Sequence, residues 1–178
     1  MSTRLKDRIQ APNKHSDVLS DRKRRMYNFL VTNPVGVLST VDPNGGPHGV
    51  VIFFVVDRQL TVKFLTRTKT KKYNNLLHND HAMLTVFEPR NQTVVQLTGK
   101  ATELSDSLEV NSVAGGIAGI NLEMTGSSLP PILKLEAGDF TVFRIDPVQA
   151  RMAVYLYSRP ENGDYQYLFD SVESFDLE

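Results

Sequence analysis

Basic and hydroxyl side chains crowd one short stretch of the chain: Arg67, Lys69, Lys71 and Lys72, interleaved with Thr66, Thr68 and Thr70. The apolar residues before this stretch predict a strand, and those after it predict a helix. A strand-to-helix turn presents free backbone N–H groups, the positive end of a helix dipole and ammonium groups at one place. This combination suits a phosphate group, and the alternative is a solvated basic loop.

Other residues that could do chemistry form weaker groups. His78 and His81 have a spacing that can chelate a metal on a helix, but no third ligand is evident, so surface or capping roles are favoured and no metal is expected. His48 either approaches a ligand or stands at a strand edge. The run from Gly115 to Gly119 does not open a helix after a strand, so it predicts flexibility rather than a dinucleotide site. No Ser-His-Asp or paired-carboxylate arrangement stands out, so no catalytic residue is assigned.

Composition narrows the class of protein. The chain has 178 residues, of which 40% are hydrophobic, which is enough for the core of one domain. The 20 basic and 20 acidic residues give zero net charge, so nothing in the total charge points to nucleic acid. There is no cysteine, which excludes disulfides and thiol chemistry. No apolar run is long enough to span a bilayer and no signal peptide is visible, so we expect a cytoplasmic protein without a membrane partner.

The elements that must position the basic turn are mainly strands. Apolar patterns bounded by turn signals predict strands at residues 35–41, 48–56, 60–66, 82–87, 93–104, 139–146, 151–157 and 165–169. Helices are expected at residues 21–31, where Ser20 is a suitable N-cap, and at residues 70–78. We expect residues 1–20 to form an extended arm and residues 21–178 to form a single domain.

Several details of this domain follow from local signals. The first three strands have short connections and predict an antiparallel meander, and residues 48–56 are apolar enough to be buried on both faces. Gly99 predicts a bulge or bend, and Pro147 is expected to end its strand. Residues 105–137 contain several Gly and a Pro-Pro pair, so we predict a short helix and a long irregular excursion. Since an antiparallel sheet must cover or close its edges, the expected fold is mainly β (α+β), a small antiparallel barrel with peripheral helices.

The order of these motifs resembles a known family. A helix precedes VGVLSTVDPNGGPHGVVIFFV, followed by VKFLTRTKTKKYNNLLHNDHAMLTV and then VVQLTGKATEL. This order is similar to that of the pyridoxamine 5′-phosphate oxidase-like family, the FMN-binding split barrels, and especially to its general-stress-protein branch. The resemblance implies a split β-barrel that forms a homodimer, with FMN in a groove between the two subunits.

The resemblance also implies which residues bind the cofactor. The backbone of Val50, Val51 and Ile52 would lie along the isoalloxazine ring, and Leu65 and Thr66 would end the next strand beside it. The phosphate would be held by Lys71 and Lys72 with Thr70 beside them, while Arg67 and Lys69 would face water. Gln92 would supply a polar contact to the ring.

Three departures from the family pattern bear on the function: the missing Arg at Val50 weakens the case for a phosphate, and the missing C-terminal pair argues against oxidation of the vitamin itself. Oxidases that act on that substrate carry Arg at the position of Val50 and Gln near Val94, and they have an Arg/His pair close to the C-terminus. Here the tail is acidic and lacks that pair. The predicted function is therefore an FMN-binding oxidoreductase acting on an unidentified small molecule. The alternatives are a non-enzymatic flavin-binding or stress-response protein, and the same barrel binding a deazaflavin or haem.

Overall fold

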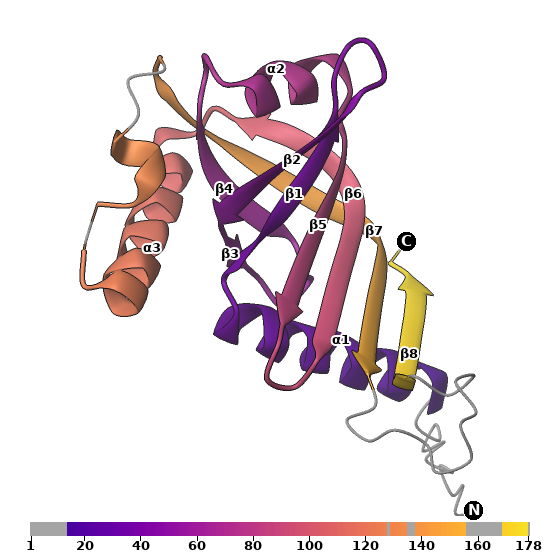
Figure 1. The fold of residues 1–178 in the computed structure, drawn as a ribbon. Coiled ribbons are helices and arrows are strands. Elements are labelled where there is room, and N and C mark those ends of the chain that lie inside the picture. The colour runs from indigo at the N-terminus through magenta and orange to yellow at the C-terminus, as the bar shows by residue number, and fades with distance from the viewer. Residues whose placement is uncertain (1–13, 128, 135–137, 156–168, 178) are drawn as a thin grey trace, which may run out of the picture.

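The computed structural model describes residues 14–127, 129–134, 138–155 and 169–177, and within them the chain forms a curled antiparallel sheet flanked by helices (Figure 1). The helices are α1 (Lys14–Thr32), α2 (Lys71–His78), α3 (Ser107–Thr125) and the 3-10 helix η1 (Pro131–Lys134). The strands are β1 (Val35–Val41), β2 (Pro47–Phe53), β3 (Val55–Val56), β4 (Val62–Arg67), β5 (His81–Glu88), β6 (Thr93–Leu104), β7 (Phe140–Tyr155) and β8 (Phe169–Asp176).

The sheet closes on itself through one bent segment of chain. Its strand order is β2-β1-β5-β6-β7-β4-β3, with β8 also paired to β7. Only Phe54 separates β2 from β3, although these two strands lie at opposite ends of the order, and its side chain is fully buried. The bend at Phe54 therefore brings the two ends of the sheet together and curls it into a barrel. β2 pairs with β1 and β3 pairs with β4, which leaves a split between β2 and β4.

This topology confirms the predicted antiparallel barrel with peripheral helices, and the neighbouring strands of the predicted meander do pair: β1 with β2, and β3 with β4. The meander is interrupted at Phe54, and β4 also pairs with β7 on its other side. The predicted strand 48–56 is divided at Phe54, and it is not buried on both faces, because Val51 is 64% exposed. Apolar composition alone could not reveal this, since a strand at the mouth of a barrel is as apolar as one inside it.

β7 runs without a break through Pro147, so the prediction that this proline ends the strand was wrong. The ladder with β6 pairs Thr98 with Gln149 and Gly99 with Pro147, and Val148 is the extra residue between them. Such a bulge accommodates a proline in a long strand. Gly99 is required there, because a Cβ atom on it would lie 2.7 Å from Pro147 Cα. The bulge predicted at Gly99 is thereby confirmed.

The helix α1 begins at Lys14, so the extended arm predicted over residues 1–20 is wrong for its last part, whereas residues 1–13 lie outside the described residues. Met26 and Leu30 of α1 are fully buried against the barrel core, and Phe29 packs beside them. These apolar residues lie within the helix predicted over residues 21–31 and attach it to the barrel. The connection between the predicted strands 151–157 and 165–169 also lies outside the described residues.

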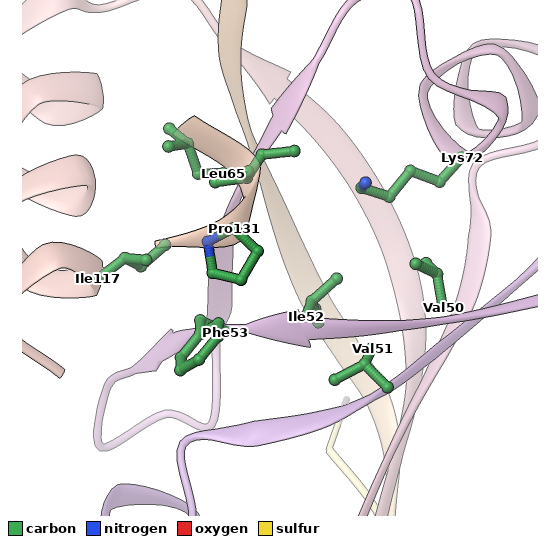
Figure 2. A pocket seen from close by; sticks show the side chains of 9 residues that line it. Val50, Val51, Ile52, Phe53, Leu65, Lys72, Ile117 and Pro131 are labelled. Atoms are coloured by element: carbon green, nitrogen blue, oxygen red, sulfur yellow. The ribbon is translucent and has the colours of Figure 1, made fainter. Parts of the chain in front are cut away.

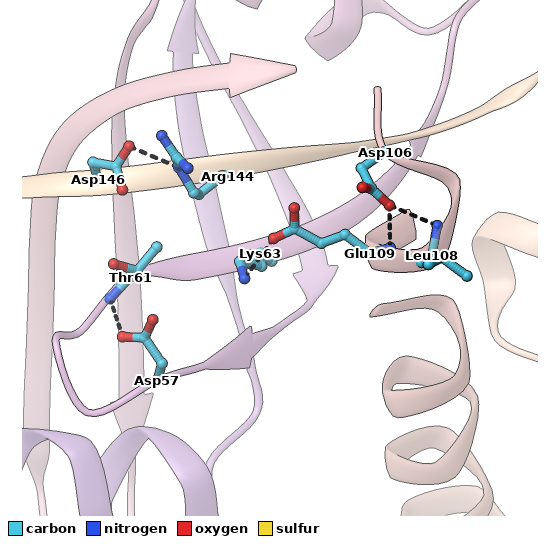
Figure 3. Close-up of polar contacts among 8 residues, drawn as sticks. All are labelled: Asp57, Thr61, Lys63, Asp106, Leu108, Glu109, Arg144 and Asp146. Atoms are coloured by element: carbon cyan, nitrogen blue, oxygen red, sulfur yellow. Dashed lines mark hydrogen bonds and ion pairs between the residues drawn. The ribbon is translucent and has the colours of Figure 1, made fainter. Parts of the chain in front are cut away.

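The excursion between β6 and β7 is more helical than predicted, because α3 continues to Thr125. The carboxylate of Asp106 caps it by accepting the N–H groups of Leu108 and Glu109 at 2.8 and 3.0 Å (Figure 3). Glu109 forms an ion pair with Lys63 of β4 at 2.8 Å, which fastens the first turn of α3 to the barrel. Tertiary packing thus overrides the low helix propensity of the glycines in this segment.

In the described part of the chain, none of the helices is both long and apolar enough to cross a membrane.

Candidate functional site: a pocket at the split of the barrel

A pocket of about 290 Å³ opens where β2 and β4 separate (Figure 2). It is lined by Val50, Val51, Ile52, Phe53, Leu65, Lys72, Ile117, Pro131 and Ile132. These residues come from β2, β4, the first turn of α2, the middle of α3 and η1. Ligand pockets usually measure about 300–1,000 Å³, so this one is at the small end of the range.

Lys72 is the charged residue of this pocket. Its side chain is only 7% exposed, and its ammonium group points into the cavity (Figure 2). Burial lowers the pKa of Lys72 from its usual value of 10.5. Within the described residues this ammonium has neither a hydrogen-bond acceptor nor an ion-pair partner. A buried cation without a partner is unfavourable, so the pocket is electrostatically prepared for an anion.

The beginning of α2 adds hydrogen-bond donors to the same end of the pocket. Thr70 is the N-cap residue, yet its side chain caps no N–H group of the helix. Its hydroxyl instead donates to the carbonyl oxygen of Arg67 at 2.7 Å and lies 3.1 Å from the hydroxyl of Thr66. The side chain of Thr70 therefore leaves the first N–H groups of α2 uncapped within the described residues, and the helix dipole there favours a negative ligand.

The other end of the pocket is apolar. Leu65 and Ile117 are buried and belong to a small satellite core that also contains Val113 and Val142. Pro131 of η1 lies on the same side of the cavity as Ile117 (Figure 2), and Ile132 of η1 also lines the cavity. Together with β2, these residues offer a surface for a planar apolar group, whereas the Lys72 end suits an anion. The pocket thus fits a ligand with one charged and one aromatic part.

Five residues that the resemblance assigns to cofactor binding line this pocket: Val50, Val51, Ile52, Leu65 and Lys72. Thr66 and Thr70 lie beside it and shape the turn before α2 through their hydroxyl groups. Their proposed contact with a phosphate stays a prediction.

Two predicted residues are placed outside the cavity. Lys71 is 56% exposed and pairs with Asp42 of the β1–β2 turn, with Nζ and Oδ2 3.4 Å apart. Backbone N–H groups of Gly46 and Asn44, together with Lys71, lower the pKa of this Asp42 carboxyl. Gln92 lies in the turn between β5 and β6 with a positive φ of 47° and does not line the pocket. The roles predicted for Lys71 and Gln92 stay untested.

The sequence did not single out four of the lining residues, namely Phe53, Ile117, Pro131 and Ile132. Phe53 directly follows the predicted ring-facing segment, so its position carried a signal. The other three belong to the excursion, whose length predicts a functional or mobile segment but does not say where it packs.

The two histidines at the end of α2 do not form a metal site. α2 ends at His78, and the Nδ1 atom of His81 contacts the side chains of Asn79 and Asp80, each at 3.1 Å. Over the described ranges, no group of three or more His, Cys, Asp or Glu side chains is placed to hold a metal ion.

A curled antiparallel barrel with a pocket at its split defines the class of split barrels. A family model described as "Pyridoxamine 5'-phosphate oxidase" matches residues 23–153, and the chain belongs to this family. Comparison with curated proteins gives no match by sequence.

Several solved structures share the fold. General Stress Protein 26 from Bacillus anthracis is 18% identical with a TM-score of 0.57, covering 74% of this chain and 92% of its own. A pyridoxamine 5'-phosphate oxidase-related, FMN binding protein from Nostoc punctiforme is 17% identical with a TM-score of 0.50, covering 96% and 98%. A heme binding protein from Mycobacterium smegmatis is 16% identical with a TM-score of 0.59, covering 89% and 58%. At these identities the likeness concerns the fold alone.

Proposed function

We propose that the protein binds FMN in the pocket at the barrel split. The observation that carries this proposal is the buried ammonium of Lys72, which is aimed into the cavity and has no partner among the described residues. Lys72 and the open N–H groups of α2 would hold the phosphate, and β2 with Leu65 would flank the isoalloxazine ring. The match to an FMN binding protein of the same fold supports this choice. A bound flavin supplies redox chemistry by itself, so the protein has to bind, orient and shield it.

We further propose that the site is completed by a second copy of the chain. The pocket of about 290 Å³ is small for a whole flavin nucleotide. The neighbouring surface of β1 and β2 is apolar and open, with the paired residues Val37 and Val51 41% and 64% exposed. Exposed apolar patches of this kind mark interaction sites. A homodimer with the cofactor groove at its interface accounts for both features.

The activity that this arrangement favours is oxidation or reduction of a small molecule by the bound flavin. Val50 places no charge near the ring, which disfavours the phosphorylated vitamin as substrate. A non-enzymatic flavin-binding or stress-response role is the second candidate, since no acid or base is needed to hold the cofactor. The haem alternative has its own observation, the match to a heme binding protein. A deazaflavin remains an alternative from the same class, and Lys72 favours any ligand of this set that carries an anionic group.

The test is a titration of the purified protein with FMN and with riboflavin, followed by quenching of flavin fluorescence. Lys72→Met is expected to weaken FMN binding on the order of tenfold to a hundredfold, because it removes a buried charge partner. It leaves riboflavin binding unchanged, because riboflavin lacks the phosphate. Lys69→Met removes an exposed charge from the same turn and is the matched control. Lys71→Met is expected to have the smaller effect of an exposed cation.

The outcomes separate the candidates. Equal losses for FMN and riboflavin would contradict the role of Lys72, and a wild-type protein that binds neither would contradict flavin binding altogether. A Soret band in the spectrum of the purified protein would favour haem. Anaerobic bleaching of the bound flavin by a nicotinamide donor would support an oxidoreductase, and resistance to every donor would support the binding-only role.

A further inference from the structure

Arg67, the last residue of β4, joins the basic turn to the excursion. Its guanidinium donates three hydrogen bonds to backbone carbonyls: Nη1 to Gly138 at 2.8 Å, Nη2 to Leu133 at 3.2 Å and Nε to Ile132 at 3.3 Å. The guanidinium carbon also lies 3.6 Å from the centroid of the Phe140 ring. The expectation that Arg67 faces water was therefore wrong. A guanidinium carries its donors on three nitrogen atoms in one plane with fixed directions, so it can reach the carbonyls of three different residues, whereas the three donors of an ammonium all belong to a single nitrogen.

The residue after Arg67 strengthens the same junction. The N–H group of Thr68 donates to the carbonyl of Asp139 at 3.0 Å, and the Thr68 hydroxyl accepts the N–H group of Asp139 at 3.1 Å. Gly138 has a φ of 85°, which suits glycine, and a Cβ atom on it would lie 2.9 Å from Lys69 Cγ. The end of the excursion is thus fitted closely against the turn that begins α2.

The element held by Arg67 has little else to fix it. η1 is four residues long and contains no buried residue. Its Ile132 and Leu133 pack only partly against the satellite core of Leu65 and Ile117. Yet η1 supplies Pro131 and Ile132 to the pocket. Among the described residues, the hydrogen bonds from Arg67 are the side-chain polar contacts that hold this part of the pocket in place.

We propose that Arg67 is a positioning residue of the pocket: it fixes η1 as the apolar wall against which the aromatic part of the ligand packs. For the identity of that ligand the proposal rests on the proposed flavin function. The basic turn then has two tasks, because Lys72 faces the charged end of the pocket while Arg67 builds its apolar end. The wall contacts no phosphate, so its contribution is common to FMN and riboflavin.

The binding test compares Arg67→Met, Arg67→Lys and the exposed control Lys69→Met. Arg67→Met is expected to weaken FMN and riboflavin by the same factor, on the order of tenfold. Arg67→Lys keeps the charge but not the fork of donors, and it is expected to give an intermediate loss for both ligands. A loss confined to FMN would overturn the proposal, since it would mean that Arg67 serves the phosphate. No loss for either ligand would overturn it as well.

A second measurement needs no ligand. The chain contains no tryptophan, so Ile132→Trp introduces a single tryptophan at the pocket, and its fluorescence can be excited selectively over that of the six tyrosines. Adding Arg67→Met or Arg67→Lys to it is expected to increase acrylamide quenching and to shift the emission to the red, while Lys69→Met changes neither. Unchanged quenching in both Arg67 variants would overturn the proposal even if flavin binds. Increased quenching in a protein that binds no flavin would support the positioning role of Arg67 and contradict only the proposed flavin function.

Discussion

At the scale of single residues, the buried charge of Lys72 is expected to favour ligand binding and to lower the stability of the ligand-free protein. Its ammonium is buried without a partner in the described part of the chain, and such a charge destabilises the folded state. Lys72→Met is therefore expected to stabilise the ligand-free protein by on the order of 1 kcal/mol, which raises the Tm by roughly 2–4 °C for a chain of this size. The same substitution weakens FMN binding. Thermal unfolding without ligand measures the first effect.

The stabilisation expected from Lys72→Met depends on pH, and the direction of that dependence can be predicted. Burial lowers the folded-state pKa of Lys72 below the value of 10.5 expected for the unfolded chain. The destabilisation by its charge is then complete below the folded-state pKa and fades as the pH rises towards 10.5. The advantage of Lys72→Met should shrink over that window. A ligand-free variant that is less stable than the wild type at neutral pH would contradict the assignment of Lys72 as an unpaired buried cation.

The same scale shows what residue patterns can and cannot tell. The basic turn was recognisable because residue types alone determine its charge, and Lys72 does line the pocket. Which of the two adjacent lysines is buried depends on the rotation of α2 about its axis, and that rotation is set by contacts with β1 through the bond from Asn75 to Thr40. The environment of Arg67 was predicted wrongly because its carbonyl partners come from a segment that is distant in the sequence.

At the scale of elements, two glycines of opposite roles offer a matched pair. A side chain at Gly99 would collide with the backbone of Asp146 and Pro147 at the β6–β7 bulge, so Gly99→Ala is expected to destabilise the protein by about 2 kcal/mol. Gly115 lies in α3 with open space around it, and Gly115→Ala should stabilise the protein by about 0.5–1 kcal/mol. Urea unfolding measures both, and a neutral Gly99→Ala would show that the bulge relaxes freely.

Elements were predictable where their signals are local. β1, β6 and α2 follow from apolar periodicity and turn residues, and the observed bounds agree with the expected ones within a residue. α3 was underestimated because its small residues have low helix propensity, whereas the capping by Asp106 and the burial of Val113 and Ile117 favour the helix. β7 was divided wrongly at Pro147 because the bulge that accommodates the proline is a property of the strand pair.

At the scale of the whole molecule, the strand order was the feature that the sequence could not reveal. Short connections favour pairing of neighbours, and β1 pairs with β2 and β3 with β4, but the bend at Phe54 carries the chain from one end of the sheet to the other, where β4 also pairs with β7. The pocket is a consequence of that bend, since it opens where β2 and β4 separate. Five of its nine lining residues could be named from the resemblance, but their meeting with α3 and η1 required the fold.

The molecule also presents a surface that tests the proposed dimer. Val37 of β1 is 41% exposed and does not itself line the pocket, although its cross-strand partner Val51 does, so a substitution there is expected to act on the ligand mainly through assembly. Val37→Lys would place a charge in the centre of the proposed interface, where a desolvated charge without a partner is unfavourable. We expect sedimentation equilibrium to show the mass of one chain in place of two. Leu108→Lys, at a residue that is 79% exposed on α3, is the control and should leave the dimer intact.

The dimer prediction is sharpest when assembly and ligand binding are measured on the same samples. If the partner copy completes the pocket, Val37→Lys weakens FMN and riboflavin by roughly tenfold or more, in parallel with dissociation, and Leu108→Lys changes neither. A monomeric Val37→Lys protein that keeps wild-type affinity would show that one chain holds the flavin alone. A wild-type protein that sediments as a monomer would reject the interface itself. In either case the small volume of the pocket would have to be explained by movement within one chain, with η1 and α3 as the parts that line its far side.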